Sequence, residues 1–461
     1  MEKHIFNRTI LREYDIRGIF GKDLNNKDSM FLGKSFATFI KKLKLNNVVV
    51  GYDGRNSSLQ LEKHLIKGLI SKGIKIYKIG LVPTPLLYYS MYKLKLDSGI
   101  MITGSHNPSN YNGFKMLLKN KSIVGKDILK ISNIAAKGKF CKNSKGIEVS
   151  KLMAKNYLKF LLKSTKISKK IRIAWDPGNG SAGKVIYDLT KKINGQHFLI
   201  NEKIDGNFPS HHPDPTVPKN LEQLITLVKK KKCDLGFAFD GDGDRLGVVD
   251  NKGKIIWADK IIAFLAKDIL KHKPNSSIIL DVKTSQSVFD EIKKLKGRPV
   301  LWKTGHSLIK KKMKEINCLF AGEMSGHIFF ADKYYGFDDA IYASIRFLNL
   351  FDSLNKPLSE ILEDLPKSFN TPELRFQSTE TEKFIIVNKL KKLLLKEKKK
   401  FIGIDGVRYQ KNKLGWWLVR ASNTQDIIVA RCESFKKENL NIIKKDLKKN
   451  LKKCGFNLPK F

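Results

Sequence analysis

The sequence predicts an α/β protein with three similar α/β domains, built on mixed sheets, and a smaller C-terminal α+β domain. Three segments, which begin at Val48, Ile171 and Ile278, repeat the order of apolar strand, glycine-rich turn and amphipathic helix. Alternating strands and helices are typical of α/β layers, and a repeat at roughly 105 to 125 residues indicates a repeated domain plan. The chain of 461 residues is long enough for three or four ordinary domains.

The chain from about Pro372 follows a different pattern. Short strand patterns alternate there with a lysine-rich helical pattern over residues 389–400. Two further strand patterns follow at residues 406–409 and 416–419. This order predicts the smaller α+β domain.

Polar or turn-forming stretches mark the expected domain boundaries at residues 142–151, 251–253 and 366–372. The predicted domains are 1–150, 151–253, 254–369 and 370–461.

Residues 103–108 carry a serine, a histidine and an asparagine on a loop rich in glycine and proline. The loop follows the apolar strand pattern of residues 99–102. The dipeptide Asn112-Gly113 predicts a turn directly afterwards, before the apolar run around Lys115. A serine at the end of a strand with a histidine and a lysine nearby suits a covalent nucleophile. A surface turn explains this segment alone equally well.

Residues 240–245 place three carboxylates at every second position. Asp240, Asp242 and Asp244 follow an apolar strand pattern, with glycines between them and Arg245 after them. Three such carboxylates repel one another unless a cation lies among them, and oxygen ligands favour Mg²⁺ or Ca²⁺. An EF-hand is excluded, because it requires glycine where Arg245 stands and glutamate where Asn251 stands.

Three other loops carry weaker signals. Residues 322–327 combine a carboxylate, a hydroxyl and an imidazole, a set that suits sugar hydroxyls. Residues 420–424 offer a guanidinium, two hydroxyls and an amide, which suit a phosphate dianion. His306 lies on a glycine turn. A polar turn remains an alternative for each of them.

Residues 178–183 match the dinucleotide-binding pattern G-x-G-x-x-G between a strand and a helix pattern. That function predicts an acidic residue about 20 positions further on, at the end of the next strand. Glu202 and Asp205 lie near that distance but in a polar stretch. We therefore interpret the motif as an ordinary strand-to-helix turn.

The composition limits the possible partners and compartment. The net charge is +44, but the lysines are spread along the chain and no nucleic-acid-binding motif accompanies them. No run approaches the ~18 apolar residues of a membrane span, and the N-terminus lacks a secretion signal. These features predict a cytoplasmic protein with no specific nucleic-acid partner and no membrane. The five scattered cysteines predict buried thiols rather than disulfides or a zinc site.

Taken together, the loops resemble the α-D-phosphohexomutase superfamily, specifically its phosphomannomutase/phosphoglucomutase branch. The resemblance runs nearly end to end, over residues 13–18, 80–85, 103–108, 205–209, 240–245, 304–307, 322–327 and 420–424. It implies four domains around a central cleft, in agreement with the threefold repeat.

The resemblance also implies roles for individual residues. Ser105 would be the serine phosphorylated in the resting enzyme, and one Mg²⁺ would be bound by its phosphoryl oxygen with Asp240, Asp242 and Asp244. The implied catalytic residues are Ser105, Lys115, His306, Arg17, Arg245 and His106, with Asn107 at the same reaction centre. The implied substrate-binding residues are Tyr14, Lys283, Glu323, Ser325, His327, Arg420, Ser422, Asn423 and Thr424.

The implied reaction interconverts hexose 1-phosphate and hexose 6-phosphate through a 1,6-bisphosphosugar, with glucose or mannose 1,6-bisphosphate as activator. Lys115 and His306 are both candidates for the general base. The preference for mannose or glucose and the pathway served stay open. A monomer is expected, with a dimer as the alternative.

One departure from the family pattern and three alternatives remain. The last loop continues Gln425-Asp426, where glutamate and proline are usual, which questions its rigidity. Phosphoglucosamine mutase, of the same fold, usually has glutamine in place of Met324. A phosphatase with Asp240 as nucleophile would leave Ser105 without a role. A polyanion-binding protein without turnover is the non-enzymatic alternative.

Overall fold

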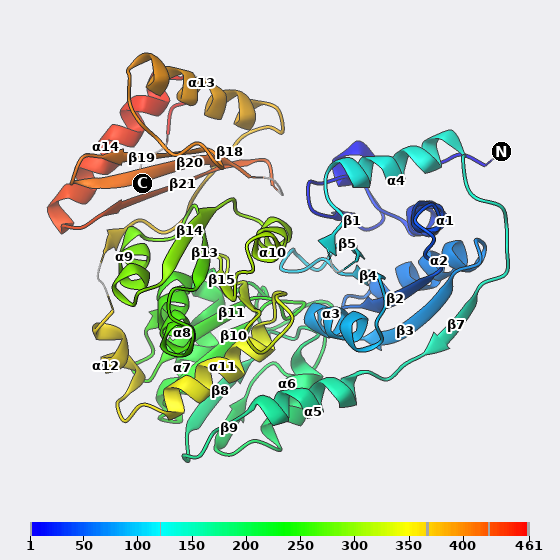
Figure 1. Ribbon diagram of the computed structural model, residues 1–461, viewed down its shortest axis with the longest axis horizontal. Coiled ribbons are helices and arrows are strands. Elements are labelled where there is room, and N and C mark those ends of the chain that lie inside the picture. The colour runs from blue at the N-terminus through cyan, green and yellow to red at the C-terminus, as the bar shows by residue number, and fades with distance from the viewer. Residues whose placement is uncertain (1, 120, 366–367, 423–424, 459–461) are drawn as a thin grey trace. The chain divides into compact units, whose positions relative to one another are not determined.

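The computed structural model describes residues 2–119, 121–365, 368–422 and 425–458 (Figure 1). The chain forms two compact units. Unit 1 comprises Met1–Ile261 and Ser325–Leu362, and unit 2 comprises Ile262–Met324 and Glu363–Phe461.

The first domain of unit 1 is built on a mixed sheet in the order β1-β5-β4-β2-β3-β7, with β6 paired to β5. Its strands are β1 (Ile16–Ile19), β2 (Asn47–Tyr52), β3 (Lys75–Leu81), β4 (Ser98–Ile102), β5 (Tyr111–Leu118), β6 (Lys121–Ser122) and β7 (Ile147–Ser150). Strands β4, β2, β3 and β7 run parallel, whereas β5 is antiparallel to both of its neighbours β4 and β1.

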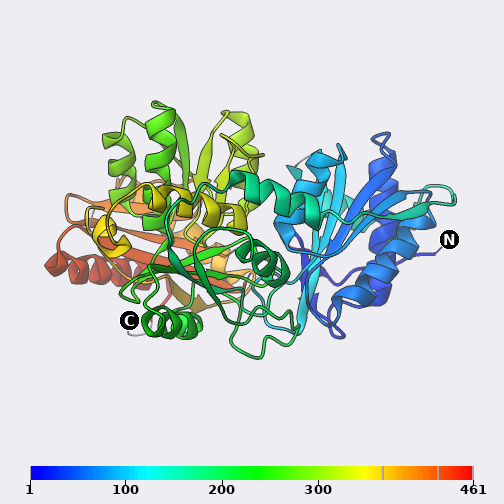
Figure 2. The same cartoon turned by 90° about the horizontal axis from the view of Figure 1, so that it is seen from below.

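The helices of this domain are α1 (Asn26–Lys41), α2 (Ser58–Ile70), α3 (Thr84–Lys93) and α4 (Lys126–Lys137), after a short 3-10 helix at Arg8–Ile10. Helices α1 and α2 lie side by side against the sheet (Figures 1 and 2). A Cβ atom on Gly33 would lie 2.3 Å from the Leu65 carbonyl oxygen, and one on Gly68 would lie 2.1 Å from that of Met30. The two glycines therefore allow direct contact between the helix backbones.

The turn predicted at Asn112-Gly113 is wrong. Both residues lie inside β5 and are buried. A Cβ atom on Gly113 would lie 2.1 Å from the Ile16 carbonyl oxygen, so this glycine serves the close pairing of β5 with β1. The chain reverses earlier, and residues 103–110 form the loop between β4 and β5.

The second domain of unit 1 has the strand order β12-β11-β10-β8-β9. Its elements are α5 (Ala154–Ser164), β8 (Arg172–Asp176), α6 (Gly183–Thr190), β9 (Gln196–Leu199), a 3-10 helix at Pro218–Leu221, α7 (Glu222–Lys230), β10 (Leu235–Phe239), β11 (Leu246–Asp250) and β12 (Ile255–Ile256). Residues 240–245 form the hairpin loop between β10 and β11. The turn at residues 251–253, where a domain boundary was expected, joins β11 to β12 of the same sheet, which therefore extends to Ile256.

Gly180, in the turn between β8 and α6, and Gly183, the first residue of α6, lie close to the backbone of other segments. A Cβ atom on Gly180 would lie 2.8 Å from the Gly241 carbonyl oxygen, and one on Gly183 would lie 2.1 Å from that of Glu202. The motif thus brings the strand-to-helix turn against the acidic hairpin loop, consistent with its interpretation as a turn.

The rest of unit 1 contains β16 (Ile328–Phe330) and α11 (Ala340–Asp352), followed by α12 (Leu358–Glu363). Helix α11 is capped by the Asp339 carboxylate, which accepts the Tyr342 N–H. The Ala340 N–H donates to the Gly243 carbonyl, so the helix starts against the acidic loop.

Unit 2 contains a parallel sheet in the order β14-β13-β15, made of β13 (Ser277–Asp281), β14 (Arg298–Trp302) and β15 (Phe320–Gly322). The helices of this region are α8 (Ala258–His272), which begins in unit 1, α9 (Gln286–Lys294) and α10 (His306–Glu315).

The C-terminal part of unit 2 is an antiparallel sheet in the order β17-β21-β20-β19, with β18 paired to β21. Its elements are β17 (Phe369–Asn370), β18 (Leu374–Gln377), α13 (Glu382–Lys396), β19 (Val407–Lys411), β20 (Gly415–Ala421), β21 (Ile427–Ser434) and α14 (Lys437–Lys453). The helix expected at residues 389–400 begins earlier, because Ile386, Val387, Leu390 and Leu394 form its buried stripe. The predicted fold class is confirmed.

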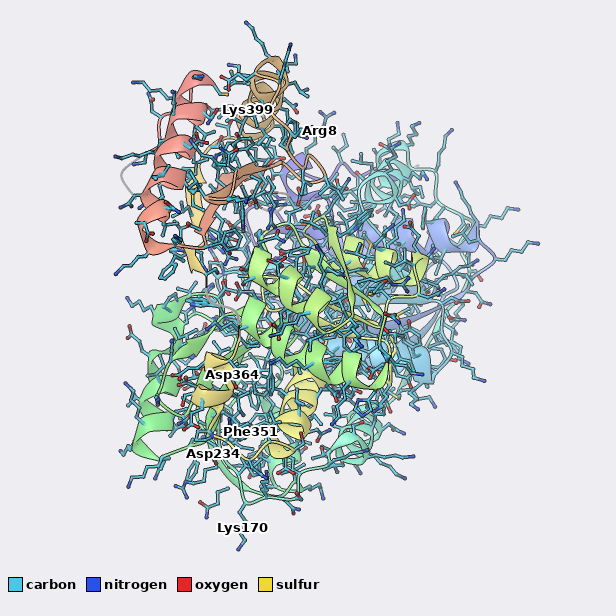
Figure 3. All side chains as sticks on the ribbon, turned by 60° about the vertical axis from the view of Figure 1, so that its left-hand side comes forward. Arg8, Lys170, Asp234, Phe351, Asp364 and Lys399 are labelled. Atoms are coloured by element: carbon cyan, nitrogen blue, oxygen red, sulfur yellow. The ribbon has the colours of Figure 1, made fainter. Side chains whose placement is uncertain are left out.

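The cysteines and lysines are distributed largely as expected. All five cysteines are free thiols, but Cys141 is only half-buried, contrary to the prediction. Blue-tipped side chains, Lys170 and Lys399 among them, project from many elements in Figure 3. Within the described residues, no helix combines the length and the apolar character needed to cross a bilayer.

Candidate active site

Ser105 lies in the loop between β4 and β5 with its backbone in the left-handed region, at φ 51°. The residue is buried, and its N–H donates to Thr103 Oγ1 over 2.7 Å. Ser105 Oγ lies 3.4 Å from Asp240 Oδ2 and 3.4 Å from His106 Nδ1. The fold therefore brings the candidate nucleophile to the acidic loop, 135 residues further along the chain.

The three carboxylates of the acidic loop converge in the interior of unit 1. Asp240, Asp242 and Asp244 are fully buried, and they offer oxygens that all lie within 4.8 Å of one another. Asp240 Oδ1 accepts the N–H groups of Asp244 and Arg245 over 3.0 and 3.1 Å, which curls the loop. Burial, and then the charges of Asp244 and Asp242, raise the pKa of Asp240 well above its usual value.

Two cations face these carboxylates. Lys115 Nζ, on β5, lies 2.7 Å from Asp242 Oδ2 and 2.6 Å from Asp244 Oδ2. Burial alone would lower the pKa of Lys115, but the two carboxylates outweigh it and raise that pKa. Arg245 Nε lies 3.9 Å from Asp240 Oδ2, and burial is likewise outweighed by Asp214 and Asp240, so the Arg245 pKa is raised.

The acidic loop fits a divalent cation. Three carboxylates against two cationic side chains leave an excess of negative charge in a buried site. Asp242 Oδ1 is buried and has no hydrogen-bond partner among the described residues. An oxygen-only set of this kind suits a hard ion such as Mg²⁺.

Residues near the start of the chain contact the loop that carries Ser105. Arg17 donates to Asn107 Oδ1 over 2.8 Å and pairs with Asp15. Tyr14, which precedes Asp15 in the sequence, is also buried. Burial, followed by the charges of Arg245 and Arg17, lowers the pKa of His106 well below its usual value. The His106 imidazole is therefore neutral near pH 7.

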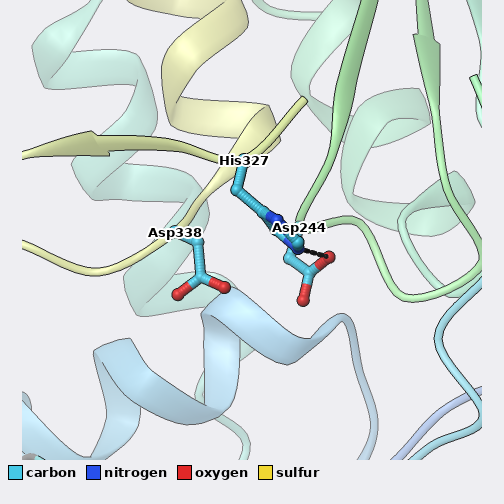
Figure 4. A group of neighbouring side chains, drawn as sticks. All are labelled: Asp244, His327 and Asp338. Carbon is cyan, nitrogen blue, oxygen red and sulfur yellow. Dashed lines mark ion pairs between the residues drawn. The ribbon is translucent and has the colours of Figure 1, made fainter. Parts of the chain in front are cut away.

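His327 approaches the acidic loop from the segment before β16. Its Nε2 lies 3.2 Å from Asp244 Oδ1 (Figure 4), and its Nδ1 lies 2.9 Å from Ser325 Oγ. The Leu246 N–H donates to the Gly326 carbonyl over 3.0 Å, which fixes this segment. Asp338, also drawn in Figure 4, is buried in the same group, although no sequence motif pointed to it.

Unit 2 brings together the other predicted site residues. The Glu323 carboxylate accepts the Gly305 N–H, next to His306. Asp405 Oδ2 accepts both the Arg420 Nε–H and the Thr304 N–H over 3.0 Å. Asp405 therefore links the loop of His306 to the predicted phosphate loop.

Lys283 is held by acids of unit 2. Its Nζ lies 2.8 Å from Glu373 Oε2 and 3.8 Å from Asp281 Oδ2. Burial would raise the pKa of Glu373, but the charges of Lys283 and Arg375 lower it to about 2. Sequence reasoning missed Asp405 and Glu373, because neither lies in a motif.

The predicted phosphate loop is described only in part. Ser422 is buried, and its Oγ accepts the Gln425 N–H over 3.2 Å. Asn423 and Thr424 lie outside the described residues.

Family models and curated relatives match nearly the whole chain. Four family models, described as phosphoglucomutase/phosphomannomutase alpha/beta/alpha domains I, II and III and C-terminal domain, match residues 8–142, 155–253, 257–369 and 373–449. The chain is 39% identical to a phosphomannomutase/phosphoglucomutase of Pseudomonas aeruginosa over 98% of this chain and 97% of the relative. It is 39% identical to a phosphoglucomutase of Neisseria gonorrhoeae over 93% of each chain.

Solved structures share the fold. A phosphoglucomutase/phosphomannomutase family protein of Burkholderia thailandensis has a TM-score of 0.92 and 35% identity, covering 99% of this chain and 100% of its own. The N-acetylphosphoglucosamine mutase of Aspergillus fumigatus, in complex with GlcNAc-6P and magnesium, has a TM-score of 0.60 and 13% identity, over 98% and 96% of the two chains. The end-to-end similarity to curated relatives identifies this chain as a phosphohexomutase isomerase that belongs to the phosphoglucomutase/phosphomannomutase family.

Proposed function

We propose that this enzyme interconverts the 1-phosphate and the 6-phosphate of mannose, glucose or both, through a phosphoserine at Ser105. The observation that supports this most directly is the position of Ser105 Oγ, 3.4 Å from Asp240 at the edge of the buried carboxylates. A phosphoryl group on this oxygen would lie beside three buried acids that two cations face. The names of the Pseudomonas and Neisseria relatives agree with both sugars.

The reaction consists of two phosphoryl transfers of opposite direction. In the first, the bond between phosphorus and Ser105 Oγ breaks and Oγ takes up a proton, while a bond to the free sugar hydroxyl forms and that hydroxyl loses its proton to a base. The product is a 1,6-bisphosphosugar. In the second, Ser105 Oγ loses its proton and takes the other phosphate, and the sugar oxygen that is released takes up a proton. Glucose or mannose 1,6-bisphosphate would therefore also charge an unphosphorylated enzyme.

The residues of unit 1 would supply positioning and charge. Phosphoryl transfer depends mainly on these two factors. Lys115 and Arg245 would neutralise oxygens of the transferring group, while Arg17 and Asn107 would hold the loop side chains in place. Mg²⁺, bound by the three carboxylates and a phosphoserine oxygen, would add further charge neutralisation. Lys115 and His306 remain the two candidates for the base, and Lys115 would first have to give up the proton that its raised pKa favours.

The residues around the sugar would set its orientation. In unit 1, Tyr14, Ser325 and His327 would offer donors and acceptors to the sugar. In unit 2, Lys283, His306 and Glu323 would do the same. The phosphate that does not react would be held by Arg420, Ser422, Asn423 and Thr424. Guanidinium and hydroxyl donors of this kind suit a phosphate dianion.

The test is the intact mass of the purified enzyme after charging with glucose 1,6-bisphosphate in Mg²⁺. We expect one added phosphate that maps to Ser105 and that exchanges on mixing with isotope-labelled mannose 1-phosphate or glucose 1-phosphate, because each full cycle returns a phosphate to Ser105. The relative rates would rank the sugars, with glucosamine 1-phosphate as a third substrate. Ser105→Ala should take up no phosphate and lose turnover. Turnover near the wild-type rate in that variant would remove Ser105 from its role.

A further inference from the structure

We propose that Arg55 is a positioning residue for phosphoryl transfer, because its guanidinium holds the loop that presents Ser105. This inference rests on the proposed role of Ser105. No sequence motif drew attention to Arg55, which lies between β2 and α2, 50 residues before the serine.

The loop is folded around the Arg55 side chain. Nη2 donates to the carbonyl oxygens of Ser105 and Asn107 over 2.8 and 2.6 Å. Nη1 donates to the carbonyl of Tyr111 over 3.0 Å and to that of Pro108. One buried guanidinium therefore satisfies three backbone acceptors of the loop and a fourth on Tyr111, the first residue of β5.

Asp53 fixes the guanidinium from the other side. Asp53 Oδ2 accepts the Arg55 Nε–H and the Gly104 N–H, each over 3.1 Å. Asp53 Oδ1 accepts the Arg55 N–H over 3.1 Å and the Ser58 hydroxyl over 2.6 Å. The carboxylate thus binds the arginine and the first part of the serine loop together. Burial lowers the pKa of Arg55, and the Asp53 charge opposes that shift.

Gly104 shows independently how tightly the loop encloses this side chain. A Cβ atom on Gly104 would lie 2.5 Å from both Cζ and Nε of Arg55. The Gly104 backbone does not have the positive φ that would itself require glycine. The same Cβ atom would lie 2.8 Å from the Tyr111 carbonyl oxygen. The lack of room for a side chain beside Arg55 and Tyr111 therefore explains the glycine.

Only arginine suits this position chemically. A buried loop carbonyl without a donor is unfavourable, and arginine carries five N–H donors in a planar fork. Lysine has three donors on one atom, so it cannot reach four separated carbonyls and Asp53 together. Ser105 itself is held in a left-handed conformation that serine seldom adopts. We infer that Arg55 maintains this conformation and thereby the distance from Ser105 Oγ to the acidic loop.

The experiment compares Arg55→Lys with Arg346→Lys. Arg346 is a matched control, because it is also a buried arginine of unit 1 but donates to Asp332 and lies over the Phe330 ring. Both variants should lower the Tm. Only Arg55→Lys should lower kcat, by about 10- to 100-fold, because small misplacements of reacting groups have effects of this size. Its KM for the sugar phosphate should stay within about twofold of wild type, since uniform binding is untouched.

The charged phosphoenzyme gives a second readout. Transfer of the Ser105 phosphate to sugar, measured in a single turnover by intact mass as the loss of an isotope-labelled phosphate, should slow in Arg55→Lys by the same factor as kcat. Gly104→Ala should slow it as well. The double variant should be less impaired than the product of the single effects, because both changes act on one contact.

Two results separate failure of this inference from failure of the proposed function. If wild-type Ser105 accepts no phosphate, the proposed function is wrong. If wild type is charged and turns over, but folded Arg55→Lys transfers phosphate as fast as Arg346→Lys, then Arg55 does not position the serine. Strictly multiplicative effects of Gly104→Ala and Arg55→Lys would also contradict the inference.

Discussion

Acidic and cationic site residues are grouped differently in the two units. In unit 1, Asp240, Asp242 and Asp244 share one small buried region, and Lys115 lies against two of them. In unit 2 the two site cations pair with different acids: Arg420 lies 3.0 Å from Asp405, and Lys283 lies 2.8 Å from Glu373 and 3.8 Å from Asp281. The three aspartates with Lys115 form a crowded set, which carries excess negative charge and suits a divalent cation. The two cations of unit 2 with their acids form a paired set, which holds cations ready for an anionic ligand.

The two units nevertheless hold a critical loop by the same means. Arg55 donates to carbonyls of the Ser105 loop, and Arg408 donates to the carbonyls of Val282 and Thr284, on either side of Lys283, over 2.9 Å. The counterparts differ. Arg55 is paired with Asp53, whereas Arg408 lies 3.8 Å from the Trp416 ring centroid, and burial lowers its pKa to about 10. Four backbone carbonyls and the Asp53 carboxylate surround Arg55. Two carbonyls and the Trp416 ring face Arg408, and the charge of Glu433 opposes the effect of burial on its pKa.

The largest expected effect tests the crowded set. Asp240→Asn keeps an oxygen for the two loop N–H groups but removes one of the three charges, so turnover should fall by at least about 100-fold. Without Mg²⁺ its Tm should equal or exceed that of wild type, because repulsion is relieved. Thermal unfolding with and without Mg²⁺, beside steady-state kinetics, measures both. A Tm well below wild type in EDTA would show that the carboxylates do not repel one another.

The next effect tests the paired set. Asp405→Asn should raise KM for the sugar phosphate about fivefold with little change in kcat, because a charged acceptor for Arg420 becomes a neutral one. Asp364→Asn, on the surface of unit 2, is the control. Steady-state kinetics at constant ionic strength provides the measurement. A fall in kcat at unchanged KM would assign Asp405 to the chemical step instead.

A smaller effect concerns the departure at Gln425-Asp426. Lys383 of α13 is fully buried, donates to the Gln425 carbonyl over 3.0 Å and lies 3.5 Å from Asp426. We expect Lys383 to stiffen the loop where proline is missing, so Lys383→Met should raise KM about threefold. Lys389→Met, exposed on the same helix, is the control for kinetics and Tm. Equal KM values in the two variants would contradict this role.

The smallest effect is a pH dependence of stability. Burial would lower the pKa of His211, but its contact with Asp176, 2.9 Å away, outweighs burial and raises it. A raised folded pKa gives stability that is complete below about pH 6.5 and is lost as the pH rises through the folded value. The Tm of His211→Gln should therefore lie about 2 °C below wild type at pH 6, and the gap should narrow by pH 8.5. A gap that widens with pH would reverse the sign assigned here.

Local sequence patterns predicted the elements that depend on local physics. The apolar runs before residues 103 and 240 are strands β4 and β10, and the strand-to-helix turn at residues 178–183 lies where expected. The Asn112-Gly113 turn failed because the same dipeptide that suits a hairpin also suits close strand pairing, and only the presence of β1 distinguishes the two. The start of α13 was misplaced because its first turns contain the unbroken apolar run of residues 384–387, which has no helical spacing by itself.

The sequence by itself determined the fold class, the family and the loops that carry the candidate chemistry, because strand and helix periodicity and motif spacing are encoded over a few adjacent residues. Only the tertiary structure decided which partners those loops have. Asp338 and Arg55 lie among the candidate site residues of unit 1, and Asp405 lies among those of unit 2. Their contacts join residues far apart in the sequence, such as Arg55 and Ser105, which are 50 residues apart. The partners of a buried charge come from segments that the fold brings together, so the residues adjacent to it in the sequence do not identify them.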